Sequence, residues 1–193
     1  ALLPGSRRQE IKALLPIMVR SALMLREQEP DLQIAVPAAH DYAREDIEAI
    51  LKKYTLGAQV TLGRTYDVLN ASKAAVVASG TATLEAALLD VPQVIIYRTS
   101  YSTFYAAKML LKIPHVGLPN IICAREIVPE LLQNDVVAPK VGEELIRIWG
   151  PKARADILAD YAIMKQHLGG PGAISRASGL VFDVVDEEIK SRA

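Results

Sequence analysis

The chain has little of what marks several common protein classes. Among its 193 residues there is a single cysteine, Cys123, which excludes an internal disulfide framework and fits a reducing compartment. The three histidines, His40, His115 and His167, lie far apart without metal-ligand spacing, and this argues against a structural zinc site. No apolar run reaches the roughly 18 residues that a membrane-spanning helix needs.

An excess of either charge is also missing. Lys and Arg together number 22, and Asp and Glu together also number 22. This balance gives no global electrostatic reason to bind nucleic acid or a strongly anionic membrane, so any basic patch has to be local. The chain does have 51% hydrophobic residues, which is ample for a sizeable core.

Helical and strand patterns alternate over the first half of the chain. Helices are predicted near residues 8–29, 42–54, 66–70 and 81–89, and strands over residues 32–36, 59–62, 74–78 and 93–97. The strands are apolar nearly throughout, as expected when helices cover both faces of a parallel sheet. The alternation predicts an α/β fold of that kind. Residues 1–3 look like the end of a further strand, so we expect the sequence to be a piece of a longer protein.

Beyond Arg98 the pattern becomes largely helical. Helices are predicted over residues 101–112, around 126–132, over 142–149 and 152–168, and from the break at 169–172 to about 190, with a loop at 113–120. We therefore divide the chain into a domain of residues 1–168 and a C-terminal helix in residues 169–193. That helix is expected to pack on something outside this chain.

Two strand-to-helix joints carry the strongest indications of a ligand site. At one, an apolar strand runs into Ser79, Gly80 and Thr81, and the helix that follows offers a phosphate its unpaired N–H groups and positive dipole end. Glu85 lies one turn further on the same helix face, where it can accept hydrogen bonds from ribose hydroxyls. Alternatively, Gly80 only permits a tight turn and Glu85 is a solvated surface residue.

The other joint lies at the start of the chain. Gly5 and Ser6 precede a helix, and Arg7 adds a cation with forked donors that suit a phosphate, unless it is simply a solvated arginine. Two such joints in one small domain indicate a single ligand crevice at the carboxyl edge of the sheet. Neither joint is a G-x-G-x-x-G or Walker motif.

A third group of polar residues surrounds the helix predicted near residue 126. Glu126, Glu130 and Gln133 are spaced to share one helix face. Arg125 precedes them and Asn120 lies in the loop before. Acceptors for sugar hydroxyls beside a cation suit a sugar nucleotide, whereas the alternative is a plain amphipathic surface helix.

These segments together resemble the lipid-A-disaccharide synthase family. The match follows the family's order and spacing through residues 3–7, 78–85, 97–98, 118–120 and 125–133. It covers nearly the whole chain, but it corresponds to only the carboxyl-terminal half of the family pattern.

The resemblance implies one half of a GT-B glycosyltransferase, an architecture of two Rossmann-like domains. Such an enzyme transfers 2,3-diacylglucosamine from UDP to 2,3-diacylglucosamine 1-phosphate, with inversion, in the lipid A biosynthesis of Gram-negative bacteria. The products are a β-1,6-linked disaccharide and UDP. This half would hold the donor, and the amino-terminal half would supply most of the acceptor site and the general base. The chain alone is therefore expected to be inactive.

The resemblance also implies roles for individual residues. Ser6 and Arg7 would meet the diphosphate, and Glu85 would hold the ribose. The backbone of Ser79, Gly80 and Thr81 would cap the diphosphate. The residues expected to border the donor phosphates and sugar are Asn120, Arg125, Glu126, Glu130 and Gln133. No metal or other cofactor is implied, because helix dipoles and arginine stabilise the departing diphosphate.

The expected partners follow from the diacylated substrates. Together with these substrates, the apolar segment 101–111, flanked by Lys108 and Lys112, predicts a cytoplasmic protein peripheral to the inner membrane. The alternative is that most side chains of this segment pack in the core. The amino-terminal half, or a second copy in a homodimer, would receive the last helix, and no nucleic acid is expected. Two rival hypotheses are a nucleotide-sugar epimerase, which the 118–133 pattern argues against, and a nucleotide-binding module without catalysis.

Overall fold

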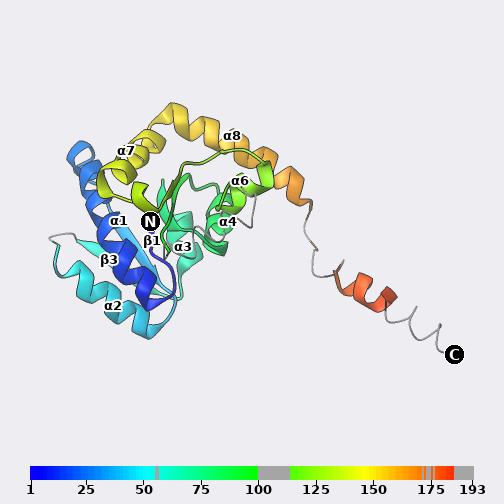
Figure 1. The fold of residues 1–193 in the computed structure, drawn as a ribbon, viewed down its shortest axis with the longest axis horizontal. Coiled ribbons are helices and arrows are strands. Elements are labelled where there is room, and N and C mark those ends of the chain that lie inside the picture. Colours follow the sequence, from blue (N-terminus) through cyan, green and yellow to red (C-terminus); the bar gives the residue numbers. More distant parts are fainter. Residues whose placement is uncertain (55–56, 100–113, 171, 173–174, 176, 185–193) are drawn as a thin grey trace.

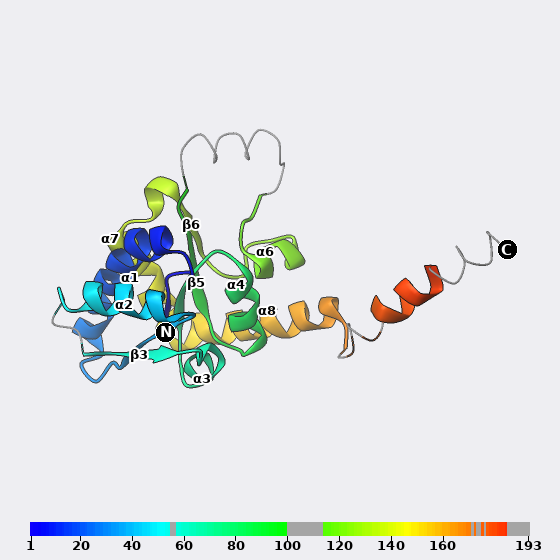
Figure 2. The same ribbon diagram turned by 90° about the horizontal axis from the view of Figure 1, so that it is seen from below.

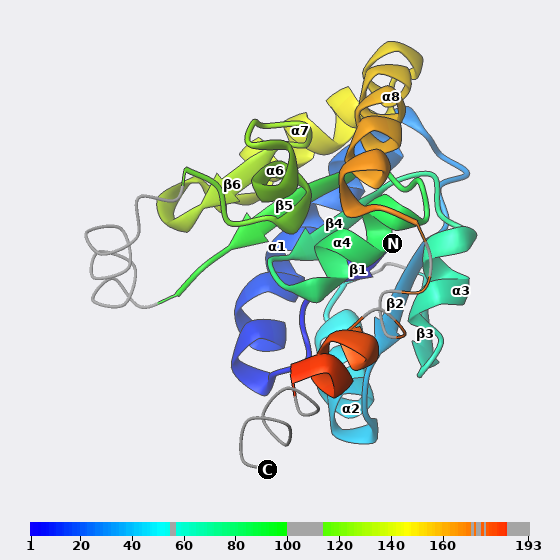
Figure 3. The same cartoon turned by 90° about the vertical axis from the view of Figure 1, so that its right-hand side faces the viewer.

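Parallel strands form the centre of the fold (Figure 1). The computed structural model describes residues 1–54, 57–99, 114–170, 172, 175 and 177–184. One sheet contains β1 (Leu2–Leu3), β4 (Ala75–Ala78), β5 (Gln93–Tyr97) and β6 (Glu130–Leu132) in that order, and a second pairs β2 (Ile34–Ala38) with β3 (Ala58–Leu62). Since β2 also contacts β1, the spatial order is β3-β2-β1-β4-β5-β6 (Figure 3).

Helices cover both faces of this sheet (Figure 2). On one face lie α1 (Arg8–Gln28), α2 (Asp41–Leu51) and α7 (Ala138–Trp149). On the other lie α3 (Thr65–Asn70), α4 (Thr81–Leu88) and α6 (Leu118–Cys123). The long helix α8 (Pro151–Leu168) contacts α7, α6 and α4, so it links the two layers. The predicted α/β class, a parallel sheet between helices, is confirmed.

The apolar residues whose spacing predicted α1 form the face that this helix buries. Ile11, Leu15, Met18, Ala22 and Leu25 recur every three or four residues, and all five are buried in the main core. The central strands are buried on both faces, as their continuous apolar character predicts. Local pattern and tertiary packing therefore agree over the strands and helices of residues 1–97.

One predicted helix is wrong. Residues 124–129 form an irregular connection, and Glu130 begins strand β6, which pairs in parallel with β5 at Ile95. Pro129 disfavours a helix across this segment because it lacks an N–H group and restricts the residue before it. Glu130 and Gln133 consequently do not share a helix face with Glu126.

The helix in this region lies earlier than predicted. The predicted loop at residues 113–120 contains the start of α6, which has Pro119 in its first turn and ends before Ala124, a residue in the left-handed conformation with φ 51°. Proline is favoured in the first turn of a helix, where its missing N–H group has no partner to lose. The helix predicted over 101–112 lies outside the described residues.

The C-terminal segment has the predicted break after α8. Gly169, with φ 76°, ends α8, and residues 177–184 are helical again. This second helix stands apart from the α/β body (Figure 1). It exposes Leu180, Val181, Phe182 and Val184. The division at residue 169 and the partner of this helix stay predictions.

Candidate functional site

The two predicted joints follow neighbouring strands, at the point in the sheet where the chain stops adding strands on one side and begins to add them on the other. β1 and β4 are neighbours, with Leu3 opposite Val77. From β1 the chain passes through α1 to β2, and from β4 it passes through α4 to β5, on the opposite side. Open parallel sheets bind ligands in the crevice at such a point, beyond the carboxyl ends of the strands.

The β1–α1 joint is a tight, braced turn. Gly5 has φ +96°, and a Cβ at this position would collide with the carboxylate of Glu10. The Tyr42 hydroxyl, from α2, donates to the carbonyl of Ser6 at 3.1 Å. Ser6 and Arg7 are exposed beside this brace. The joint thus presents a hydroxyl and a guanidinium from a fixed backbone.

Charge at this joint favours an anion. Arg7 and Arg8 place two cations at the positive end of the α1 dipole, which is unfavourable without a compensating negative charge. Part of that compensation is internal, because Arg7 pairs with Glu10 at 3.0 Å and Arg8 with Asp46 at 3.5 Å. The Arg7 side chain is still 82% exposed, so its remaining donors are accessible.

The β4–α4 joint offers free backbone donors. Ser79 does not supply one, since its N–H donates to the carbonyl of Ile96 and its hydroxyl to the carbonyl of Val116. Within the described residues, the N–H groups of Gly80, Thr81 and Ala82 have no acceptor. A Cβ built on Gly80 meets nothing within 4 Å, so the space before these groups is open. A phosphate can therefore approach them.

Glu85 lies one turn into α4 and is half-buried. Its Oε1 accepts a hydrogen bond from the Tyr66 hydroxyl, at 3.2 Å, across from α3. The negative charge of Glu85, together with this hydrogen bond, raises the pKa of the Tyr66 phenol. No other described residue donates to Oε2, which leaves one carboxylate oxygen as an acceptor for a ligand hydroxyl.

Asn120 and Glu130 have interior partners. The amide oxygen of Asn120 accepts from the N–H groups of Ile127 and Val128, and its Nδ2 donates to the Val128 carbonyl and to Glu130. The Glu130 carboxylate also accepts from the N–H groups of residues 116 and 117. The hydrogen bonds of the Asn120 side chain are therefore all to other residues of the protein. Asn120 and Glu130 both hold the backbone of loops around the crevice in place.

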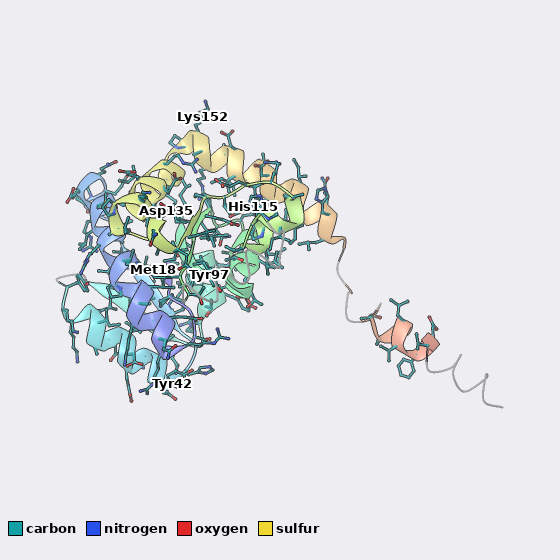
Figure 4. All side chains as sticks on the ribbon, in the orientation of Figure 1. Met18, Tyr42, Tyr97, His115, Asp135 and Lys152 are labelled. Atoms are coloured by element: carbon teal, nitrogen blue, oxygen red, sulfur yellow. The ribbon has the colours of Figure 1, made fainter. Side chains whose placement is uncertain are left out.

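His115 adds a further contact to Glu130. Its Nδ1 lies 3.9 Å from the Glu130 Oε2, and both side chains are largely buried. Figure 4 labels His115, which precedes α6. This contact joins the start of the loop at residues 115–117 to the same carboxylate that accepts from the backbone N–H groups of residues 116 and 117.

Gln133 lies just beyond the carboxyl end of β6. It is only 7% exposed and has φ 50°, unusual for a residue other than glycine. Its Oε1 accepts from the N–H of Thr99 at 3.3 Å, but its Nε2 is buried without a partner. A buried, unpaired donor costs free energy, so the Gln133 amide is poised for an acceptor that the described protein does not provide.

Arg125 and Glu126 differ from the rest of their group. Arg125 donates through both terminal nitrogens to Asp160 on α8, and this hydrogen bonding raises the pKa of the guanidinium. Arg125 thus ties the end of α6 to α8. Glu126 is exposed and makes no hydrogen bond or ion pair with another described residue.

Comparison with known proteins decides the family. The sequence model described as lipid-A-disaccharide synthetase matches residues 1–162. The chain is 42% identical over 186 residues to the lipid-A-disaccharide synthase of Myxococcus xanthus, covering 96% of this chain and 49% of that protein. It is 39% identical over 189 residues to the synthase of Geobacter sulfurreducens, covering 97% and 49%. For that of Nitrosococcus oceani the identity is 36% over 192 residues, covering 100% and 50%.

The chain belongs to the lipid-A-disaccharide synthase family. It spans about half the length of the curated relatives that it matches. The fold is consistent with one half of a two-domain GT-B enzyme.

In this member of the lipid-A-disaccharide synthase family, several residues at the crevice were not predicted. Tyr42 braces the first joint, Tyr66 contacts Glu85, and Thr83 and His115 support the second joint. Three of them lie on α2, on α3 or in the loop at residues 115–117, and only the fold brings these segments to the crevice. Thr83 did carry a signal, because it lies in the same segment as Ser79 and Glu85.

Two further observations bear on what this lipid-A-disaccharide synthase chain can hold. Within the described residues, no group of three His, Cys, Asp or Glu side chains could hold a metal ion. A cavity of about 610 Å³ lies near the beginnings of β1, β2 and β4, lined by Ala1, Gln33 and Ala74 among others. It is at the amino edge of these strands, so we place the candidate site at the opposite edge on the geometry of the joints.

Proposed function

We propose that this chain is the donor-binding half of an inverting glycosyltransferase. The reaction is transfer of 2,3-diacylglucosamine from UDP to 2,3-diacylglucosamine 1-phosphate in lipid A biosynthesis. The observation that carries the proposal is the pair of joints that follow the neighbouring strands β1 and β4, one with Arg7 and the other with free N–H groups at the start of a helix. Membership of the lipid-A-disaccharide synthase family supports it.

Each side of the crevice has a role in donor binding. The N–H groups of Gly80 and Thr81 and the Arg7 guanidinium bind the diphosphate and stabilise the negative charge that grows on it as the glycosidic bond breaks. Glu85 accepts from the ribose hydroxyls, and Ser6 adds a hydroxyl beside the diphosphate. Gln133 and Glu126 border the sugar, with the unpaired Gln133 Nε2 as a donor.

The other components of the reaction lie outside this chain. An amino-terminal half supplies most of the acceptor site and the general base that deprotonates the acceptor hydroxyl. Residues 169–193 pack on that half or on a second copy of the chain. The exposed apolar side chains of residues 180–184 suit such a contact, because their burial removes apolar surface from water.

The diacylated substrates place the enzyme at the surface of the inner membrane, on its cytoplasmic side. No described helix is both long and apolar enough to cross a membrane. The segment 101–112, with Lys108 and Lys112, is the proposed contact with the membrane and lies outside the described residues.

Removing Glu85 or Arg7 should weaken UDP binding by different routes. We expect Glu85→Ala and Arg7→Ala each to lower the affinity roughly ten- to a hundredfold, since each loses a hydrogen bond to a charged group. Glu85→Ala should abolish the discrimination between UDP and an analogue without ribose hydroxyls. Arg7→Ala should keep that discrimination and reduce the preference for UDP over uridine. Calorimetry with the three ligands measures both ratios.

Two exposed residues provide matched controls for these variants. Arg20 lies on α1, the helix that Arg7 precedes, and Glu143 lies on α7; neither side chain makes a hydrogen bond or ion pair with another described residue. Arg20→Ala and Glu143→Ala should leave all three affinities unchanged. If the two patterns were exchanged between Glu85 and Arg7, the assignment of ribose and diphosphate would have to be reversed.

A further inference from the structure

Thr83 is a buried residue whose hydroxyl joins two segments of the crevice. The side chain is fully buried on α4. Its Oγ1 donates to the carbonyl of Gly80 at 2.7 Å and accepts from the N–H of Leu118 at 3.3 Å. Since the Leu118 backbone can only donate to this oxygen, the single hydroxyl proton of Thr83 is directed toward the Gly80 carbonyl.

These bonds fix the orientation of the Gly80–Thr81 peptide. The Gly80 carbonyl accepts from the N–H of Thr83, at 3.2 Å, as well as from its hydroxyl, so this carbonyl points into α4. In a planar trans peptide the N–H group points opposite to the carbonyl. The N–H of Thr81 is therefore directed off the start of the helix, toward the open space before Gly80.

The partner segment, which is the loop at residues 115–117 and the first residue of α6, Leu118, is itself held from two sides. Glu130, on β6, accepts from the N–H groups of Val116 and Gly117 at 2.9 and 2.8 Å. On the other side, the Ser79 hydroxyl donates to the Val116 carbonyl at 3.0 Å. The Leu118 N–H thus reaches Thr83 from a restrained backbone, and the restraint extends from β6 to the β4–α4 joint.

We propose that Thr83 is a positioning residue of the diphosphate site. It does not touch the ligand. It holds the Thr81 N–H in the direction that an anion requires, so the free-energy cost of reorienting this donor when the ligand binds is small. The inference rests on the proposed donor-binding function and adds a residue to it. Loss of a positioned donor should lower the affinity for the diphosphate and leave the affinity for the nucleoside unchanged. A general effect on folding should instead lower both affinities.

The test compares UDP with uridine in variants of the 193-residue chain. Thr83→Val keeps the shape of the side chain and removes both hydrogen bonds of its hydroxyl. We expect about a three- to tenfold lower affinity for UDP and an unchanged affinity for uridine. Thr83→Ser keeps the hydroxyl and should restore the UDP affinity. A purely structural role would affect both ligands alike and would not be rescued by serine.

Thr61 supplies the matched control. Its hydroxyl oxygen, on β3, is buried without a partner, so Thr61→Val makes the same chemical change without losing a hydrogen bond. Neither affinity should change. If Thr83→Val fails to fold, Ser79→Ala replaces it, because this variant removes the hydrogen bond between the Ser79 hydroxyl and the Val116 carbonyl at the same joint. It should reduce the preference for UDP over uridine about two- to fivefold.

Inorganic pyrophosphate separates failure of this inference from failure of the donor proposal. If the wild-type chain does not bind UDP, the donor proposal fails. Pyrophosphate should still shift the amide resonances of Gly80, Thr81 and Ala82, and Thr83→Val should diminish the shift. If wild type binds UDP, an equal UDP affinity of Thr83→Val would overturn the positioning role. An equal pyrophosphate shift in wild type and Thr83→Val, or no pyrophosphate shift in the wild-type chain, would overturn it as well.

Discussion

Residues 1–193 alone should bind UDP and synthesise no disaccharide. The proposed donor groups lie between Ser6 and Gln133, around one edge of one sheet, so we expect the proposed donor crevice to be largely preformed in this chain. Inverting transfer also needs a base beside the acceptor hydroxyl and a cleft from which water is excluded, and a single domain provides neither. Calorimetry should give a UDP dissociation constant on the order of micromolar to millimolar, because one side of the ligand stays in water.

Adding the missing half tests the same expectation in the other direction. A separately produced amino-terminal half should restore measurable transfer from UDP-2,3-diacylglucosamine if the two halves associate. The same half without residues 1–193 should be inactive and serves as the control. Robust synthesis by residues 1–193 in isolation would mean that the catalytic base lies within this chain.

Asn120→Ala should strongly destabilise the fold. Its buried side chain satisfies two N–H groups and one carbonyl in residues 127–128 and also donates to Glu130. Truncation leaves these buried groups unpaired, so we expect the free energy of unfolding to fall by roughly 2–4 kcal/mol. Equilibrium denaturation in urea, followed by circular dichroism, measures the change.

Asn70 is the control for this substitution. It is exposed at the end of α3 and its side chain makes no hydrogen bond with another described residue, so Asn70→Ala should change the unfolding free energy by at most about 0.5 kcal/mol. An Asn120→Ala variant as stable as Asn70→Ala would show that residues 124–130 do not depend on the Asn120 side chain.

Asn120 also illustrates why sequence alone assigned the polar group at residues 120–133 incompletely. Its residue types suit a sugar nucleotide, and the same types suit a buried network that holds a loop. Only the fold shows that Asn120 has its side-chain hydrogen bonds inside the protein and that Arg125 pairs with Asp160, whereas Gln133 retains an unpaired Nε2. Chemical type predicts what a side chain can bind, and its partners decide what it does bind.

The missed strand β6 has a related cause. The segment is short, and its apolar spacing is compatible with a helix as well as with a strand. Pairing with β5, at Ile95 and Ile96, selects the strand, and that partner lies more than thirty residues away in sequence. Long-range hydrogen bonding overrode a weak local preference.

The sequence by itself determined the α/β alternation, the family and the two glycine joints. These features are local: apolar periodicity sets each helix and strand, and a glycine and small polar residues set each turn. The tertiary structure alone decided the strand order that brings the β1–α1 and β4–α4 joints together. It also decided which donors stay free, since Ser79 is engaged by Ile96 and Val116 while the N–H of Thr81 is not. Hydrogen-bond satisfaction depends on residues distant in sequence, so only the folded chain determines it.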